Sequence, residues 1–471
     1  MNNNSLWRQV ALVASGALIA QGMNFLTALA MTRIYSSYDV GLFGTFSSLV
    51  SLVAVASGLR YELAVPIPKR DGTAINLLIL ACSSVFVFAT VILLIVTFLS
   101  ITGLLFNLEL DNHYLYTLPF GIAAAGLYQA NTYWAIRQSD FRGISNSHIL
   151  QSSVRFVAQF SFSWIVVGPT GLIVGSIFSH LVGTVLLIAR AWTGKREIWQ
   201  QIRWSRMRFL ARRFNHFPKF SVIEGLAASA GTQLPILVFA TNFPVTLVGQ
   251  FVLAVQVAHV PLRLIGSAMG QVLLSRITLA RHSGNLGELM TSSFQVLARL
   301  GIAPLLMASA ISPELFSLTF GERWHLAGIY TSCLIPILIL EFLFIPLSVV
   351  SAASEQQFAA LSTRLLLVGI PIVVMCVVAM MTDDPFIVIS SYSAIGCIAY
   401  FFYGTWIMNV SGVSARTWIR LLSLEFLLAL LPFIFLMVLK LMIGSAELNV
   451  LLVGIGLTGM FSWLYISARK M

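Results

Sequence analysis

The sequence is poor in charged residues. Only 10% of its 471 residues are Asp, Glu, Lys or Arg, and 58% are hydrophobic, whereas an ordinary soluble domain is roughly a quarter charged. Apolar stretches of about twenty residues, long enough to cross a bilayer as helices, recur from Val10 to the last residues. This composition excludes a water-soluble fold and predicts a protein that crosses a membrane many times.

Groups for covalent chemistry and metal binding are also scarce. The seven histidines are scattered, and the four cysteines lie inside apolar stretches without metal-ligand spacing. The sequence contains no phosphate-binding loop and no nucleotide-binding domain. We therefore expect no enzymatic activity, no cofactor, no metal site, no disulfide and no direct use of ATP. The cysteines are Cys82, Cys333, Cys376 and Cys397.

Apolar runs bounded by charges, prolines or turn residues predict about fourteen transmembrane helices. They are far longer than the strands of a membrane barrel, which have about ten alternating residues. The predicted fold is therefore an all-α membrane protein. The expected helices are 9–33, 39–59, 73–101, 115–136, 145–167, 171–191, 217–239, 245–274, 290–310, 325–351, 359–381, 386–408, 417–440 and 447–468.

Basic residues gather on one side of this topology. The formal charge is +11, and alternate gaps between the helices hold most of the 28 lysines and arginines. By the positive-inside rule, these gaps and both chain termini face the cytoplasm of a bacterial inner membrane. Because the basic residues are divided among short gaps, we expect membrane lipid as the partner and no nucleic acid.

The longest basic gap divides the chain. Residues 192–216 interleave arginines with aromatic residues, which is typical of an interfacial amphipathic helix, although an ordinary topogenic loop fits equally. A short echo on its two sides suggests an internal repeat, because Val40-Gly41-x-Phe43 returns as Val248-Gly249-x-Phe251. We expect a lobe of six helices at 1–191, a linker at 192–216, a second lobe at 217–409 and two additional helices at 410–471.

Two predicted helices carry polar stripes with a central arginine. Arg155 and Gln159 belong to one stripe, and Gln256, His259 and Arg263 belong to the other. A charge near the bilayer centre costs at least about 2.5 kcal/mol, so such residues face a bundle interior or a hydrated cavity. Since guanidinium groups form paired hydrogen bonds with phosphate, the stripes predict a cavity that binds an anionic headgroup.

A third intramembrane arginine, Arg299, lies on an otherwise apolar helix and is a further candidate for this cavity. The alternative for all three arginines is a structural ion pair with an intramembrane acid, for which the sequence offers Glu224, Glu341 and Glu425.

Glu224 is a candidate for coupling to a proton or another cation, with a structural ion pair as its alternative. Pro235 and Pro261 interrupt two predicted helices and are candidate hinges, although proline is frequent in membrane helices in general.

The N-terminal residues resemble the Wzx-like polysaccharide flippases of the multidrug/oligosaccharidyl-lipid/polysaccharide (MOP) exporter superfamily. The stretches 31–50 and 58–74 carry the likeness, which in motif covers only about the first hundred residues. In that family a Gly-x-Phe opens the second helix and an Arg-Tyr-Glu-x-Ala-x-x-x-Pro element closes it. The matching positions are Gly41, Phe43, Arg60, Tyr61, Glu62, Ala64 and Pro68.

This resemblance implies a V-shaped, MATE-like bundle of two six-helix lobes with two more helices. It implies alternating access that flips undecaprenyl-diphosphate-linked repeat units of O-antigen (lipopolysaccharide), capsule or exopolysaccharide from the cytoplasmic to the periplasmic leaflet. Arg60 and Glu62 would gate the cytoplasmic mouth, or form only a local salt bridge. Polymerase and chain-length proteins are implied partners, and H⁺ or Na⁺ is the expected coupling ion.

Three other functions are consistent with parts of the sequence. A cation-coupled multidrug exporter of the same superfamily is the nearest, although acids rather than arginines would be expected in its cavity. A membrane glycan polymerase or ligase would need a sizeable periplasmic loop, which the short external gaps do not provide. A structural membrane scaffold would not depend on Arg155 or Arg263.

Overall fold

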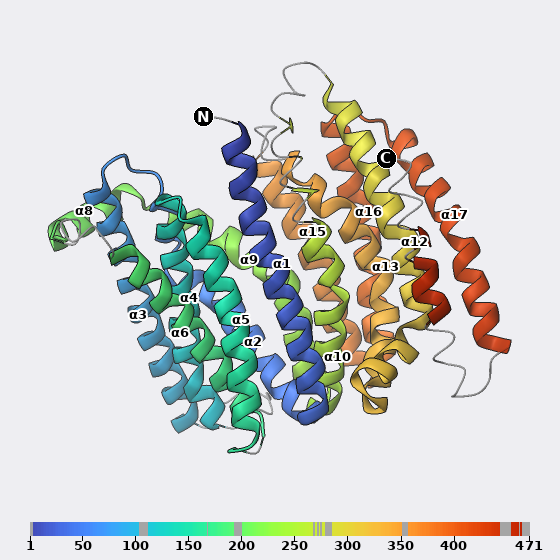
Figure 1. The fold of residues 1–471 in the computed structure, drawn as a ribbon, viewed down its shortest axis with the longest axis horizontal. Coiled ribbons are helices and arrows are strands. Elements are labelled where there is room, and N and C mark those ends of the chain that lie inside the picture. Colours follow the sequence, from blue (N-terminus) through green and yellow to red (C-terminus); the bar gives the residue numbers. More distant parts are fainter. Residues whose placement is uncertain are drawn as a thin grey trace. The chain divides into compact units, whose positions relative to one another are not determined.

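The computed structural model describes residues 3–102, 112–166, 168–192, 200–266, 285–350, 357–442, 454–460 and 462–463, with isolated positions between 269 and 277. Every regular element in these ranges is a helix (Figure 1), which confirms the predicted all-α fold. The chain divides into two compact units, residues 1–249 and 250–471.

The bounds of the helices follow the chain order. The first unit contains α1 (Asn3–Ile34), α2 (Ser37–Ser57), the 3-10 turn η1 (Tyr61–Ala64), α3 (Asp71–Thr102), α4 (Asn112–Arg137), α5 (Phe141–Ser163), α6 (Thr170–Trp192), α8 (Trp204–Arg213), the π-helical turn η2 (Phe217–Ser221) and α9 (Val222–Asn242). Helix α10 (Val245–Ala258) runs from the first unit into the second. The second unit continues with the π-helical turn η3 (Leu262–Gly266), α12 (Leu286–Phe320), the 3-10 turn η4 (Glu322–Trp324), α13 (His325–Leu347), α15 (Gln357–Met381), α16 (Pro385–Val410) and α17 (Ala415–Met442).

The predicted spans from 9–33 to 417–440 each coincide with helical structure. Within 245–274, the helical span runs from Val245 to Gly266 and ends in the π-helical turn η3, and most of the residues from 267 to 274 lie outside the described part of the chain. The last span, 447–468, lies mostly outside the described residues, of which 454–460 and 462–463 are helical. In the described part of the chain, ten helices are long and apolar enough to cross a membrane.

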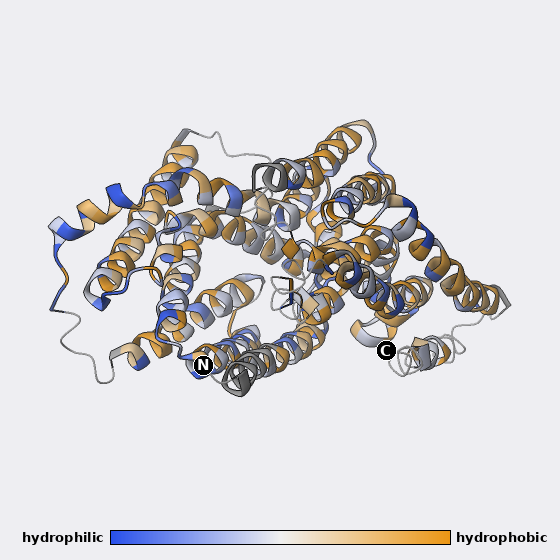
Figure 2. Cartoon of the chain, turned by 90° about the horizontal axis from the view of Figure 1, so that it is seen from above, coloured by the Kyte–Doolittle hydropathy of each residue, from blue (hydrophilic) through white to orange (hydrophobic). Residues whose placement is uncertain are grey.

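The long helices expose apolar side chains on their outer faces. Met380 and Leu431 are 81% and 71% exposed, and Figure 2 shows hydrophobic residues along most of the long helices. In water such exposure would cost about 25 cal/mol per Å² of apolar surface. Lipid removes this cost, so the exposed surface is that of a multi-pass membrane protein.

Helix α2 and the start of α10 meet backbone to backbone at two glycines. A Cβ on Gly41 would overlap the carbonyl oxygen of Val245, and a Cβ on Gly249 would overlap that of Ser37. The contact is reciprocal, because Val245 follows Ser37 and Gly249 follows Gly41 by the same 208 positions. The echo in the sequence thus corresponds to a locally symmetric contact that only glycine permits.

Two ion pairs join α12 to α17. Arg299 Nε lies 3.0 Å from Glu425 Oε1, and Lys440 Nζ lies 2.7 Å from Glu314 Oε1. On each helix the two charged residues are fifteen positions apart, about 22 Å along the axis. Helices α12 and α17 therefore run in the same direction in a fixed register.

The basic linker contains a short helix, α8 (Trp204–Arg213). Met207 and Leu210 are buried, the latter in a hydrophobic cluster with residues of α3 and α4, while Arg206 and Arg208 are exposed. Hydrophilic and hydrophobic residues alternate along this helix at the left of Figure 2.

Asn76, fully buried in α3, anchors the segment that precedes α8. Its Oδ1 accepts a hydrogen bond from the backbone N–H of Arg203 at 2.9 Å, and its Nδ2 donates to the carbonyl of Gln201 at 3.0 Å. One buried side chain therefore satisfies the backbone of the linker where it meets α3.

Candidate functional site

A polar cluster lies inside the first unit, between α4, α5 and α6. We define the Arg155 cluster as Tyr128, His148, Gln151, Arg155 and His180. The ring of Tyr128 lies 6.2 Å from that of His148 and 6.0 Å from that of His180, measured between centroids. His180 is within electrostatic reach of Arg155. Three helices therefore bring hydrogen-bonding side chains around one arginine.

Three buried polar atoms of the Arg155 cluster have no hydrogen-bond partner within the described part of the chain. They are Arg155 Nε, Gln151 Nε2 and His180 Nδ1. No acidic side chain among the described residues forms an ion pair with Arg155. A buried donor without a partner costs about 1–3 kcal/mol, and more when it is charged. The arrangement is therefore poor for stability and suited to an anion that supplies the missing acceptors.

Glycine on α6 makes room for this cluster. A Cβ on Gly183 would overlap Nε2 of Gln151, so the absence of a side chain lets the amide lie against the α6 backbone.

Gln159, in the same predicted stripe as Arg155, has protein partners instead. Its side-chain Nε2 donates to the backbone carbonyl of Leu172 at 3.1 Å, and its backbone carbonyl accepts from the Tyr35 hydroxyl at 2.9 Å. Gln159 is buried and joins α5 to α6 and to the residue after α1, so these contacts are those of a packing residue.

In the second unit, the residues of the predicted polar stripe have different surroundings. Gln256 and Arg263 are exposed, the latter on the π-helical turn η3. His259 instead contacts an acid, with its Nε2 3.4 Å from Glu341 Oε2 on α13. The Tyr400 hydroxyl on α16 donates to Glu341 Oε1 at 3.4 Å. Ser267 and Gln271, which continue this stripe at helical spacing in the sequence, lie outside the described residues.

Arg299 forms a structural ion pair, which was the alternative to a role in the cavity, because its partner is Glu425 as described above. Glu224 is exposed in the first turn of α9 and forms no ion pair with any described residue. Helix α9 continues through Pro235 without interruption. Pro261, in contrast, lies between the end of α10 and η3, where the helical hydrogen bonding changes.

Arg60 and Glu62 lie in a tight turn after α2. Leu59 and Arg60 have φ angles of 49° and 59°, a left-handed conformation that is uncommon for such residues. Arg60 Nη1 lies 3.8 Å from Glu62 Oε1, which also accepts from Gln129 Nε2 at 3.4 Å. Glu62 Oε2 and Arg60 Nε are buried and have no partner among the described residues.

The surroundings of this turn explain its geometry. A Cβ on Gly225 of α9 would overlap the guanidinium of Arg60, so that group lies directly against the α9 backbone. Burial raises the pKa of the Glu62 carboxyl above its ordinary value of 4.5, and a backbone hydrogen bond and Arg60 only partly offset this effect. The turn therefore links the α2–α3 loop to the start of α9 through a buried, incompletely satisfied pair.

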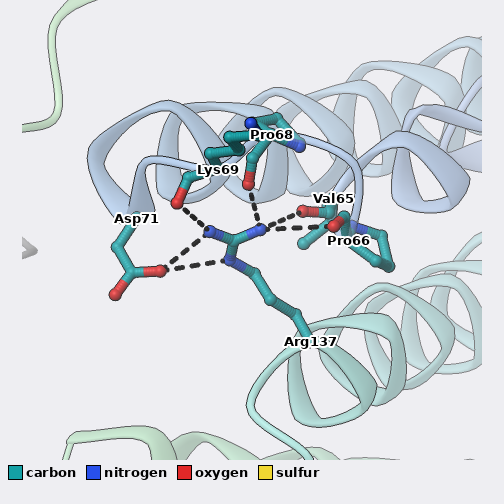
Figure 3. A network of polar contacts seen from close by, with 6 residues as sticks. All are labelled: Val65, Pro66, Pro68, Lys69, Asp71 and Arg137. Atoms are coloured by element: carbon teal, nitrogen blue, oxygen red, sulfur yellow. Dashed lines mark hydrogen bonds and ion pairs between the residues drawn. The ribbon is translucent and has the colours of Figure 1, made fainter.

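Arg137, at the end of α4, holds the rest of the α2–α3 loop (Figure 3). Its Nη2 and Nε donate to Asp71 Oδ1 at 2.8 and 3.2 Å, and the same guanidinium donates to four loop carbonyls. These carbonyls belong to Val65, Pro66, Pro68 and Lys69. No local sequence pattern marks Arg137 as the partner of this loop.

No group of three or more potential metal ligands lies together in the described part of the chain.

Comparisons with known proteins identify the fold and the family of this chain. Among solved structures, the lipid II flippase MurJ in an inward closed conformation superposes with a TM-score of 0.75 at 12% identity, covering 98% of this chain and 99% of that chain. An inward-facing multidrug resistance MATE family transporter of the MOP superfamily superposes with a TM-score of 0.65 at 14% identity, covering 83% of this chain and 95% of that chain. An outward-facing MATE family transporter gives 0.57 at 15% identity, covering 86% and 96%.

These structures show that the chain has the fold of MOP-superfamily transporters. No curated protein sequence matches the chain. The family model described as polysaccharide biosynthesis protein matches residues 30–328, more than half of the 471-residue sequence. The chain therefore belongs to the polysaccharide biosynthesis protein family.

Proposed function

We propose that the protein flips a lipid-linked oligosaccharide from the cytoplasmic to the periplasmic leaflet of a bacterial inner membrane, with both termini in the cytoplasm. The cargo is an undecaprenyl-diphosphate-linked repeat unit of O-antigen, capsule or exopolysaccharide. Family membership supports a role in polysaccharide biosynthesis, and the fold supports transport. Transport by alternating access is coupled to H⁺ or Na⁺, and polymerase and chain-length proteins act next on the flipped unit.

The unpartnered Arg155 cluster is the observation that carries this proposal. Its three orphaned polar atoms and its uncompensated arginine match the acceptor-rich, negatively charged diphosphate of such a cargo. Arg299 is not included, because Glu425 already neutralises its charge.

The test is leaflet transfer in reconstituted vesicles. A fluorescent undecaprenyl-diphosphate oligosaccharide is placed in one leaflet, and its appearance in the other is followed with a membrane-impermeant quencher. Wild-type protein should accelerate transfer, and Arg155→Ala should lower the rate at least about tenfold, since a charged hydrogen bond contributes about 1.5–3 kcal/mol. Arg142→Ala is the matched control, because Arg142 is exposed on the same helix.

Two results would overturn the proposal. Equal rates for Arg155→Ala and Arg142→Ala would show that the cluster does not handle the cargo. Vesicles that move a lipophilic cation in response to an ion gradient, and leave the diphosphate lipid in place, would indicate a drug exporter instead.

A further inference from the structure

Helix α8 packs its apolar face against its own unit. Leu210 lies in a hydrophobic cluster with residues of η1, α3 and α4, and Met207, one turn earlier, is also buried. The Tyr61 hydroxyl of η1 donates to the carbonyl of Ala211 at 3.3 Å, and Asn76 of α3 holds the backbone just before the helix. The protein itself therefore covers the face that an interfacial amphipathic helix would place in lipid.

The opposite face of α8 is basic and contains one aromatic side chain. With 3.6 residues per turn, Arg208 and Arg212 lie one turn apart on the side opposite Leu210. Phe209 lies beside them, on the side opposite Met207, and is 61% exposed. Both arginines are exposed as well. We define the α8 basic face as these three residues and the exposed arginines that flank them, Arg206 and Arg213.

The positive charge of this face has no counterpart nearby in the chain. All charged residues between positions 200 and 223 are basic. None of the arginines of the α8 basic face forms an ion pair with an acid in the described ranges. A positive surface without an internal counterion attracts anionic groups from outside the protein.

The anchoring of α8 to α3 places this face at the level of the lipid headgroups. Helix α3 has 32 residues, about 48 Å, whereas the hydrocarbon core of a bilayer is about 30 Å thick. Both ends of α3 therefore extend into the headgroup layers. Asn76, the contact with the segment before α8, is five residues from the start of α3, about 7.5 Å. Figure 1 shows α8 beside this end of α3.

Anionic phospholipid headgroups match both the charge and the aromatic side chain. Guanidinium groups donate paired hydrogen bonds to phosphate. Aromatic side chains concentrate at the boundary between headgroups and acyl chains, and Trp204 at the start of α8 is, like Phe209, largely exposed. A soluble acidic protein would also satisfy the charge, but the headgroup level of α8 favours lipid as the occupant.

We propose that the α8 basic face binds the headgroups of anionic phospholipids and thereby anchors the linker to the membrane surface beside the first unit. The ligand is a lipid of the surrounding bilayer and not the transported cargo. The proposal therefore stands or falls independently of the proposed function.

Lipid binding is tested with a fluorophore on α8. Ser205 is exposed on the same side as Arg208 and Arg212, so Ser205→Cys is labelled in a background without the native cysteines. The protein is placed in phosphatidylcholine nanodiscs that contain increasing fractions of a quencher lipid, either phosphatidylglycerol or phosphatidylcholine with a nitroxide near the top of one acyl chain. With the arginines intact, half-quenching should require at least tenfold less of the phosphatidylglycerol than of the phosphatidylcholine.

Arg208→Gln/Arg212→Gln should bring the two half-quenching fractions within about twofold of each other, since each basic residue near an anionic surface contributes about fivefold. Unchanged quenching by the phosphatidylcholine would show that α8 stays in place in this variant. The matched control is Arg416→Gln/Arg420→Gln, which removes two exposed arginines one turn apart at the start of α17 and should keep the full preference.

Equal quenching by the two lipids with the arginines intact would overturn the proposal and leave the α8 basic face to an acidic protein. A preference that survives in Arg208→Gln/Arg212→Gln would also overturn it. So would an equal loss in the control variant, because the charge of the whole protein, rather than α8, would then attract the lipid.

Discussion

Arg137 and Arg155 show how differently one type of residue serves in the same unit. The Arg137 guanidinium donates to a carboxylate and to backbone carbonyls of one loop, whereas Nε of Arg155 is buried without a partner among the described residues. The first pattern is typical of a structural arginine, and the second is typical of an arginine that can still bind an acceptor from a ligand. The distinction depends on contacts between distant residues.

Replacing Arg137 should destabilise the protein much more than replacing its ionic partner. Arg137→Ala removes donors from several loop carbonyls at once, at about 1 kcal/mol or more for each buried acceptor. Asp71→Asn removes only a pair whose acid is 45% exposed, worth about 0–1 kcal/mol. Thermal unfolding in detergent should show the larger decrease in Tm for Arg137→Ala. Equal decreases would mean that the carbonyl contacts contribute nothing.

The raised pKa of Glu62 predicts a pH-dependent stability. Because folding favours the neutral carboxyl, wild-type stability is highest below the ordinary value of 4.5 and falls as pH rises through the folded-state pKa. Glu62→Gln cannot ionise, so the Tm of the variant relative to the wild type should increase between pH 4 and pH 7, by about 1–3 °C. A difference in Tm that stays constant with pH would contradict the buried, raised-pKa carboxyl.

Sequence patterns identify some of these residues and not others. Arg155 was a candidate because a charge in a long apolar run must face a bundle interior or a hydrated cavity. Tyr128 and His180 were not, since only the packing of α4, α5 and α6 brings them near Arg155. The sequence also did not show that Gln159 has hydrogen-bond partners in the protein while Arg155 Nε has none among the described residues. Both residues lie on the same predicted stripe, and the stripe does not reveal which backbone carbonyls of neighbouring helices are within reach.

At the scale of helices, existence was easier to predict than continuity. Apolar runs identify long helices because the bilayer sets their length. Within the predicted span 245–274, the helix continues as a single span to Gly266, and its hydrogen bonding changes to the π-helical pattern at Leu262, next to the candidate hinge Pro261. Pro235 was the same kind of candidate, yet α9 is α-helical on both sides of it. A proline removes one hydrogen bond in both helices, and tertiary packing determines how the backbone adjusts.

The glycine contact between α2 and α10 predicts strong sensitivity to a single methyl group. Gly41→Ala and Gly249→Ala each place Cβ on a backbone carbonyl oxygen, which cannot rotate away. We expect each to lower the Tm by several degrees or to prevent folding, as overpacking costs about 1–3 kcal/mol or more. Gly369→Ala on α15 is the control, because no atom lies within 4 Å of its added Cβ. An unchanged Tm in Gly41→Ala would contradict the contact.

The ion pairs between α12 and α17 predict a charge-swap rescue. Arg299→Glu alone places two carboxylates together and should reduce the yield of folded protein, measured by size-exclusion chromatography. The double variant Arg299→Glu/Glu425→Arg restores opposite charges and should recover at least half of the lost yield. The second pair should behave in the same way, with the yield lost in Lys440→Glu recovered in the double variant Lys440→Glu/Glu314→Lys. A double variant no better than its single parents would mean that the pairs do not fix the register.

At the scale of the whole molecule, the proposed topology, with both termini in the cytoplasm, rests on charge, because lysine and arginine resist translocation. Asp383 and Arg416 flank α16, one before its start and one after its end. In a background without the native cysteines, Asp383→Cys should react with an impermeant thiol reagent applied from the periplasm, and Arg416→Cys only after the inner membrane is permeabilised. The reverse pattern would place the termini in the periplasm.

The reciprocal contact of Gly41 with Val245 and of Gly249 with Ser37 has a consequence for ancestry. When one residue contacts a second and their counterparts contact in the same way, the arrangement is isologous, as in a two-fold symmetric homodimer. A shift of 208 positions relates the two sides. An ancestral chain of about that length, paired with a second copy through this glycine, would become the present contact once its gene was duplicated and fused. The glycine would then be older than the covalent connection between the copies.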